Sequence, residues 1–309
     1  MTAENVVFGT GPLGLAVARS LVSSGKAVRL VNRSGEAPAA PTGAEVFAAD
    51  ASDPTTARRA CDGASVVFHC ATHSYGQWDK ALPPIMNGII EGAAAAGARI
   101  VYGDNLYGYG PVDGPLREDL PYRPVGPNTK TRAEVATTLM NGHASGKVRA
   151  TIGRGSDFYG PHALQSKAGD GIFARALAGK PAQVLGNPDV PHTLTFIDDF
   201  GSALVTLSQH DEALGEVWHV PNPEAVTMRS FIEMVFQELG QPARLEGVPT
   251  LVINGLALFV PAMAAIKETM YQSQRPWLVD HSKYVRAFGG HPTPYKTAIS
   301  QTIAWFRTA

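Results

Sequence analysis

The N-terminal stretch, which ends near Asn32, constrains the fold of this chain more than any other feature of the sequence. Asn5 to Phe8 is a short apolar run rich in β-branched residues and predicts a buried strand. Gly9-Thr10-Gly11-Pro12-Leu13-Gly14 follows directly, then apolar residues at helical spacing, then a second apolar run. A G-x-G-x-x-G turn between a strand and a helix predicts a site for nucleotide phosphates. The glycines let the backbone approach a pyrophosphate, and the helix N-terminus offers free N–H groups. A glycine-rich turn without a ligand is the alternative.

The end of the second strand indicates which dinucleotide binds. NAD enzymes usually carry Asp or Glu there, and this carboxylate accepts a hydrogen bond from the ribose 2′-hydroxyl. This chain has Asn32-Arg33-Ser34 instead, so no carboxylate repels a 2′-phosphate, and Arg33 can pair with one. We therefore expect NADP(H) to be favoured, with NAD(H) still open. The alternative for Arg33 is a solvated charge at a strand end.

Predicted strands and helices alternate through the first half of the chain. Apolar runs at 45–50, 65–69, 99–102 and 148–153 predict further strands, with helical segments between them. This alternation is typical of an α/β protein with a Rossmann-type doubly wound parallel sheet. In such a sheet the loops that follow the strands meet at one edge.

The alternation loosens after residue 155, which indicates a smaller second unit. Helical segments are expected near 171–178, 198–209 and 227–239, and short strands near 182–185, 194–197 and 216–220. We expect residues 1–155 to form an NADP-binding Rossmann domain, with a later strand–helix contribution near 194–220. Residues 156–309 are expected to form a smaller C-terminal substrate-binding cap, interleaved with the first unit. Arg154 to Pro161 is expected to be a turn-rich connector.

The composition bears on partners and compartment. The chain has 309 residues and a formal net charge of −1, so we expect no nucleic-acid partner. Its two cysteines form no C-x-x-C pair and its histidines no metal-binding pattern, which indicates a cytoplasmic protein without a metal site. No signal peptide is expected. The longest apolar stretch, Val248 to Ile266, is borderline for a membrane span; we expect a buried helix, or a subunit or lid contact. A small-molecule substrate is expected, and a homodimer is left open.

Six motifs, in order, resemble one known family. The glycine turn is followed by Asp50, by Phe68-His-Cys-Ala71, by Asn87, by Arg154-Gly-Ser-Asp-Phe-Tyr-Gly-Pro161 and by Thr195-Phe-Ile-Asp-Asp199. With them the chain resembles the extended, atypical short-chain dehydrogenase/reductases, the NAD(P)-dependent epimerase/dehydratase group. The glycine turn and strand ends, together with this resemblance, give the expected cofactor-binding residues: Gly9, Thr10, Gly11, Pro12, Leu13, Gly14, Asn32, Arg33, Ser34, Asp50, Ala51, Cys70, Ala71 and Lys130.

The catalytic positions depart from the family pattern. The family uses Tyr-x-x-x-Lys, in which the tyrosine transfers the proton and the lysine lowers its pKa. Here Lys130 and Glu134 match, but the tyrosine position is Gly126. The family's Ser or Thr position is Asn105. The usual acid/base group is therefore missing, and a proton donor must come from elsewhere or the chemistry must need none.

Nearby tyrosines are the candidate replacements. In an extended segment alternate residues share a face, so Asn105, Tyr107 and Tyr109 could point together. We expect Tyr107 to supply the proton, Asn105 to orient the carbonyl through its amide, and Lys130 to hold the nicotinamide ribose. Tyr109 could instead be a packed turn residue, Asn105 could only cap the turn, and Asp157 is a weaker candidate acid.

Three functions remain open on the sequence alone. The first is an NADP(H)-dependent short-chain oxidoreductase with a displaced proton donor. It would act on a small or moderately hydrophobic carbonyl or alcohol, since few arginines cluster to clamp a nucleotide diphosphate. The second is a nucleotide-sugar epimerase or dehydratase that recycles hydride, and the third is a non-enzymatic NADP(H)-binding sensor or regulator.

Overall fold

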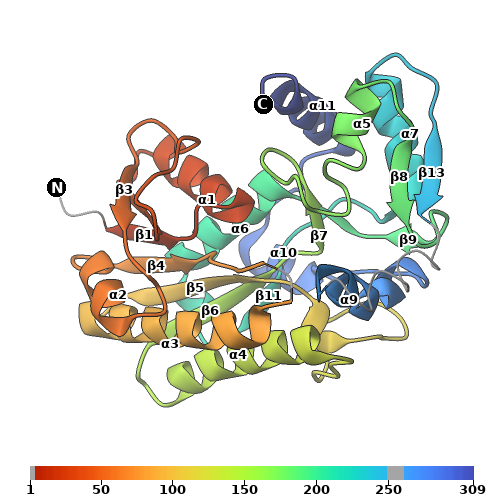
Figure 1. Ribbon diagram of the computed structural model, residues 1–309. Coiled ribbons are helices and arrows are strands. Elements are labelled where there is room, and N and C mark those ends of the chain that lie inside the picture. Colours follow the sequence, from red (N-terminus) through yellow and green to blue (C-terminus); the bar gives the residue numbers. More distant parts are fainter. Residues whose placement is uncertain (1–3, 75, 249–260) are drawn as a thin grey trace.

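A parallel sheet of seven strands forms the centre of the molecule, in the order β11-β6-β5-β4-β1-β2-β3 (Figure 1). The structure is a computed structural model and describes residues 4–74, 76–248 and 261–309. The strands are β1 Asn5–Phe8, β2 Val28–Asn32, β3 Glu45–Ala48, β4 Val66–His69, β5 Arg99–Asp104, β6 Arg149–Arg154 and β11 Val217–His219. All pair in parallel. Phe8 of β1 pairs with Val31 of β2 and with His69 of β4, so the carboxyl ends of these three strands lie at the same edge of the sheet. The predicted fold class is confirmed.

The strand order reverses beside β1. From β1 the chain moves outward through β2 and β3, then crosses back to β4 and continues outward on the other side. A ligand crevice forms at such a switch point, outside the carboxyl ends of the strands.

Helices cover both faces of the sheet. On one face lie α1 (Pro12–Ser23) and α6 (Ile197–Gln209), which pack on each other, with α10 (Ser282–Phe288) beside β11. On the other face lie α2 (Pro54–Ala60), α3 (Trp78–Ala96) and α4 (Pro127–Ala144) (Figure 1). Two short 3₁₀ helices, η1 (Tyr107–Tyr109) and η2 (Asp211–Ala213), follow β5 and α6. Each face buries its own apolar cluster, so the sheet is covered on both sides, as apolar parallel strands require.

The remaining elements gather beyond the carboxyl edge of the sheet, at the upper right of Figure 1. Three two-stranded pairs occur there, β7 with β10, β8 with β13 and β9 with β12. Their core is aromatic and includes Tyr159, Phe173 and Phe231. The bounds are β7 Asp157–Tyr159, α5 Phe173–Leu177, β8 Ala182–Leu185, β9 Pro191–His192, β10 Leu194–Phe196, β12 Val226–Thr227, α7 Met228–Glu238, β13 Leu245–Val248, α9 Pro261–Glu268, η3 Met270–Ser273 and α11 Tyr295–Phe306.

Two sequence expectations differ from this structure or fall outside it. The expected turn-rich connector after Arg154 contains a strand, β7, because it pairs with β10 far along the chain. Of the apolar stretch from Val248 to Ile266, residues 249–260 lie outside the described residues, and α9 begins at Pro261. Within the described parts of the chain, no helix has the length and apolar character needed to cross a membrane.

Candidate functional site

The glycine turn holds α1 tightly against the sheet and leaves its outer side open. Gly9 has a φ of +103°, and a Cβ there would lie 2.8 Å from the Ala71 backbone. A Cβ at Gly14 would lie 1.9 Å from the Gly9 carbonyl oxygen, so only glycine allows this close packing. A Cβ at Gly11, by contrast, would meet no other described heavy atom within 4 Å. This open space above the N-terminus of α1 fits a pyrophosphate.

The loop after β2 is shaped by Asn32. Its Nδ2 donates to Thr10 Oγ1 at 2.9 Å and to the Glu36 carbonyl oxygen at 2.8 Å, and its Oδ1 accepts from the Gly35 N–H at 2.7 Å. Asn32 therefore ties this loop to the glycine turn. Arg33 and Ser34 remain exposed beside it.

Asp50, at the end of the third strand segment, is also exposed. Its carboxylate accepts hydrogen bonds from the Ser52 hydroxyl at 2.7 Å and the Ser52 N–H at 2.9 Å, and these bonds lower the pKa of Asp50. The group is thus an acceptor at the same edge of the sheet. Ala51, Cys70 and Ala71 continue this edge, each half-buried.

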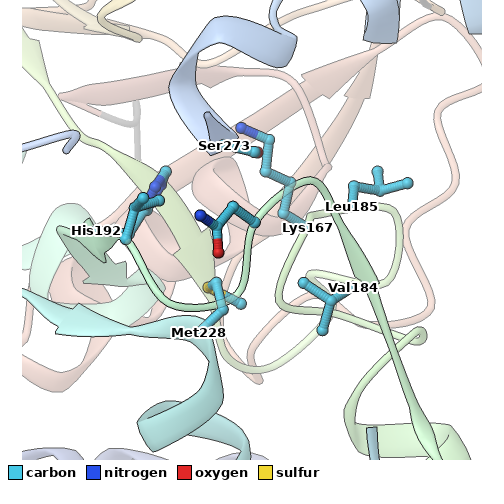
Figure 2. A pocket seen from close by; sticks show the side chains of 8 residues that line it. Lys167, Val184, Leu185, His192, Met228 and Ser273 are labelled. Carbon is cyan, nitrogen blue, oxygen red and sulfur yellow. The ribbon is translucent and has the colours of Figure 1, made fainter. Parts of the chain in front are cut away.

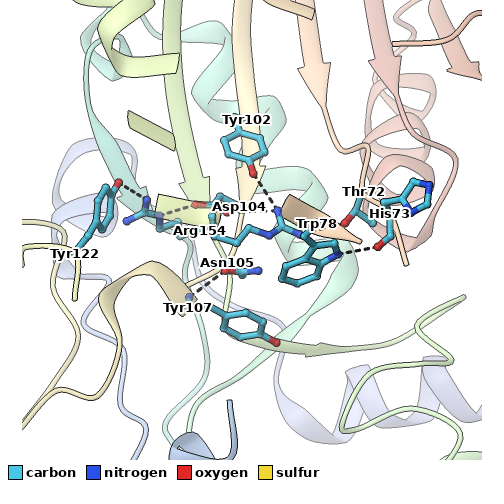
Figure 3. A network of polar contacts seen from close by, with 10 residues as sticks. Thr72, His73, Trp78, Tyr102, Asp104, Asn105, Tyr107, Tyr122 and Arg154 are labelled. Carbon is cyan, nitrogen blue, oxygen red and sulfur yellow. Dashed lines mark hydrogen bonds and ion pairs between the residues drawn. The ribbon is translucent and has the colours of Figure 1, made fainter. Parts of the chain in front are cut away.

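A buried charge network lies under the carboxyl ends of β5 and β6 (Figure 3). Arg154 Nε donates to Asp104 Oδ2 at 3.1 Å, and both side chains are 2% exposed. Arg154 also donates to the Tyr122 hydroxyl at 2.5 Å. Burial opposes the charge on Arg154, but Tyr109 and Asp104 offset this effect and raise its pKa. Arg154 is therefore a fixed cation in the site floor.

Arg132 joins this network from α4. Its guanidinium donates to the Tyr102 hydroxyl at 3.0 Å and to Thr72 Oγ1 at 3.1 Å, and it lies 3.7 Å from Asp104. Its Cζ is 4.2 Å from the centre of the Trp78 ring. Arg132 thus places a cation at the ends of β4 and β5.

Lys130 lies apart from this network, and its role in holding a ribose stays a prediction. Its side chain is 68% exposed, and Nζ is 3.6 Å from Glu134 Oε1 one turn along α4. The reason is helical periodicity. Arg132, Val135 and Leu139 form the buried face of α4, so position 130 falls on the solvent face.

The segment after β5 is not extended, so the predicted shared face of Asn105, Tyr107 and Tyr109 is wrong. Asn105 Oδ1 accepts from the Tyr107 N–H at 3.0 Å, a local bond at the start of the 3₁₀ turn η1. Tyr109 is fully buried, and its hydroxyl bonds His219 Nε2 at 3.0 Å, as a packed turn residue would. Tyr107 points elsewhere. Its ring stacks on Trp78 at 6.3 Å, and its hydroxyl lies 3.4 Å from Asp157 Oδ1.

Asp157 is the centre of a second polar group. Its Oδ2 lies 2.8 Å from Lys167 Nζ and 2.9 Å from His192 Nε2, and its side chain is 6% exposed. Burial alone would raise the pKa of Asp157, but Lys167 and His192 more than offset this and hold it below its usual value. Asp157 is therefore an ionised acceptor for the Tyr107 hydroxyl.

A small cavity of about 20 Å³ opens beside this group (Figure 2). Lys167 and His192 form its polar side, and its apolar side includes Val184, Leu185 and Met228. The volume is that of about one water molecule. Within the parts of the chain that the structure describes, no group of three or more metal-ligating side chains occurs.

Sequence reasoning missed Arg132, Lys167 and His192 as site residues. Arg132 was detectable, because it lies three and seven positions before Val135 and Leu139 on one helical stripe. Lys167 and His192 carry no local signal, since long-range folding alone brings them to Asp157.

Comparison with known proteins agrees with this architecture. Residues 6–220 match the model of the NAD dependent epimerase/dehydratase family. The chain belongs to this family. Its members are NAD(P)-dependent enzymes, so a nicotinamide dinucleotide is the cofactor, and the open glycine turn fits it. The preference for NADP(H) stays a prediction.

Individual relatives are distant in sequence and close in fold. The chain is 26% identical over 263 residues to dTDP-6-deoxy-L-talose 4-dehydrogenase (NAD(P)(+)) of Kitasatospora kifunensis, covering 79% of this chain and 81% of that one. It superposes on dTDP-glucose 4,6-dehydratase of Streptomyces venezuelae with NAD and TYD bound, at a TM-score of 0.80 and 17% identity, covering 98% and 97% of the two chains. UDP-glucose 4-epimerase of Thermus thermophilus in complex with NAD gives a TM-score of 0.78 at 18% identity, covering 99% of each.

Proposed function

We propose that this protein is an NADP(H)-dependent oxidoreductase that acts on a small or moderately hydrophobic carbonyl or alcohol, with Tyr107 as the proton donor. The observation that carries the proposal is the Tyr107 hydroxyl, 3.4 Å from the ionised Asp157. This pair joins the turn after β5 to the start of β7, between the sheet edge and the elements beyond it. We place the boundary between cofactor and substrate regions near residue 155, with α6 and β11 returning to the sheet.

The cofactor would lie along the carboxyl edge of the strands. The open glycine turn would hold its phosphates, Asp50 its adenine amino group, and Arg33 a 2′-phosphate. When bound, the nicotinamide supplies or accepts the hydride. Arg132 is fixed against Trp78 and Thr72. It would place a cation near the nicotinamide ribose, the role expected of Lys130.

Tyr107 would move the proton at the substrate oxygen. At rest the Tyr107 hydroxyl donates its one proton to the ionised Asp157, which orients it. In the reaction this proton would turn to the substrate oxygen and leave a tyrosinate beside the Asp157–Lys167 pair. Lys167 balances the charge of Asp157 at 2.8 Å. Asn105 Oδ1 already accepts from the Tyr107 N–H. The Asn105 amide NH₂ would therefore be the group that donates to a substrate carbonyl. General acid help of this kind contributes about two to four orders of magnitude in rate.

The charge pattern favours an uncharged substrate. The lysine and the histidine that line the cavity, Lys167 and His192, both bond Asp157. They therefore offer little free positive charge to a diphosphate. A nucleotide-sugar substrate is the second candidate, favoured by the name of the curated relative, dTDP-6-deoxy-L-talose 4-dehydrogenase. Membership of an enzyme family weighs against the non-enzymatic sensor.

The test is steady-state turnover of NADPH with a panel of carbonyl compounds, run beside dTDP- and UDP-linked 4-keto sugars. The proposal expects turnover with small ketones or aldehydes and little with the nucleotide sugars. Turnover confined to the nucleotide sugars would establish the second candidate. Cofactor binding without turnover of any carbonyl would contradict both and support the sensor.

A further inference from the structure

The space beside Gly126 is filled by a side chain from far along the sequence. Gly126 precedes α4, and a Cβ there would lie 2.4 Å from Cδ of Glu268, at the end of α9. The backbone itself makes no demand for glycine, because φ is −168° and ψ is −178°, an extended conformation open to any residue. A side chain at position 126 would therefore have to displace the Glu268 carboxylate.

Glu268 uses this space to bind the N-terminus of α4. Its Oε1 accepts from the Thr129 N–H at 2.7 Å, and its Oε2 accepts from the Asn128 N–H at 3.2 Å and from Asn128 Nδ2 at 2.9 Å. The first N–H groups of a helix have no partner within the helix, and the helix end favours negative charge. A carboxylate in this position is therefore held firmly.

The chain that follows Glu268 leads directly to the Asp157 group. Gln272 on η3 is fully buried, and its Oε1 accepts from Lys167 Nζ at 2.9 Å. The next residue, Ser273, accepts at its carbonyl oxygen from the Asn187 N–H at 2.8 Å. One short segment thus connects the start of α4 with Lys167, which in turn contacts Asp157.

We propose that Glu268 is a positioning residue of this enzyme. Its carboxylate fills the space beside Gly126 and fastens η3 to α4, so that Gln272 holds Lys167 against Asp157. The proposal rests on the proposed function for its effect on catalysis, but the fastening itself can be tested without turnover.

The test is a double-mutant cycle of Gly126→Ala and Glu268→Ala, read by amide hydrogen exchange over residues 269–280 and by kcat per cofactor-binding site. Alanine at 126 would displace the carboxylate, so each single variant is expected to raise exchange at 270–273. Each is expected to lower kcat about tenfold, as a misplaced catalytic group does, with cofactor affinity unchanged. Once the carboxylate is gone, Gly126→Ala adds no strain, so the double variant should behave like Glu268→Ala alone.

Matched controls separate positioning from general instability. Gly142→Ala lies in the same helix, where a Cβ would meet Val148 at 3.4 Å, and should leave exchange at 270–273 unchanged. Glu268→Gln keeps one acceptor for the Thr129 N–H and should restore part of the protection. Additive effects in the cycle, or unchanged exchange in Gly126→Ala, would overturn the proposal. So would a kcat per binding site that stays constant while the melting temperature falls. If the unmutated protein turns over no carbonyl, the proposed function fails, and the exchange cycle still decides the fastening.

Discussion

At the scale of residues, one exposed charge underlies the predicted cofactor preference. Arg33 stands at the carboxyl end of β2, and a bidentate arginine–phosphate contact contributes on the order of 1.5–3 kcal/mol. We therefore expect NADPH to bind at least about tenfold more tightly than NADH, and Arg33→Ala to remove most of that difference. Lys26, an exposed cation at the other end of the strand, is the matched control. Calorimetry with both cofactors measures the effect, and equal affinities in the unmutated protein would refute it.

Buried histidines give a pH dependence to stability. Burial, with help from Arg132, lowers the pKa of His69 to about 3, and burial lowers that of His219 to about 3. The unfolded chain binds the proton below pH 6.5 while the folded chain does not, so the free energy of unfolding falls as pH falls. Between pH 7 and 5.5 each histidine should account for a loss of about 1 kcal/mol.

His69→Phe isolates one of these contributions. The histidine ring stacks on Tyr102 at 4.6 Å, and phenylalanine keeps that shape without the titrating group. Urea unfolding at pH 7 and pH 5.5 should show a smaller stability loss in the variant, by about 1 kcal/mol. An identical loss in both proteins would mean that His69 is protonated in the folded state.

At the scale of elements, substitutions on the buried and exposed faces of α4 should have different effects on stability and cofactor binding. Arg132→Gln removes a buried cation shared by Asp104, Tyr102 and Thr72, and should cost about 2 kcal/mol of stability or more and weaken cofactor binding. Lys130→Gln on the exposed face should change stability by less than about 0.5 kcal/mol and leave cofactor binding intact. The reverse pattern in urea unfolding and calorimetry would restore Lys130 to the site.

Elements with local signals were predictable from sequence, and long-range partners were not. Asp53 and Pro54 predict the start of α2, and the Asp53 carboxylate does accept from the Thr55 N–H at 3.0 Å. The sequence predicts an extended segment over 105–109 and does not reveal the 3₁₀ turn after β5. The Asn105 side chain accepts from the Tyr107 N–H, and such local bonds compete with extended structure. Glu268 and Thr129 are 139 residues apart, and no local pattern links them.

At the scale of the molecule, the sheet edge brings these parts together. Under the proposed function, the glycine turn and the ends of β2, β4 and β5 would form the cofactor side, and β7 with its Asp157 would form the substrate side. Fold class and phosphate turn follow from alternation and glycine spacing, which are local. The position of the proposed proton donor, Tyr107, depends on how the elements beyond the sheet pack against the sheet edge. A carboxylate held ionised by Lys167 stands there, where the turn after β5 presents Tyr107.

The most direct test of this account is the kcat of Tyr107→Phe for carbonyl reduction. Loss of the hydroxyl should lower kcat by about two orders of magnitude or more, with the dissociation constant of NADPH little changed. Tyr295→Phe removes a hydroxyl that donates to the Glu224 carbonyl oxygen at 3.1 Å, and it should keep the kcat of the unmutated protein. A Tyr107→Phe enzyme that retains its full kcat would contradict the assignment of Tyr107 as the proton donor.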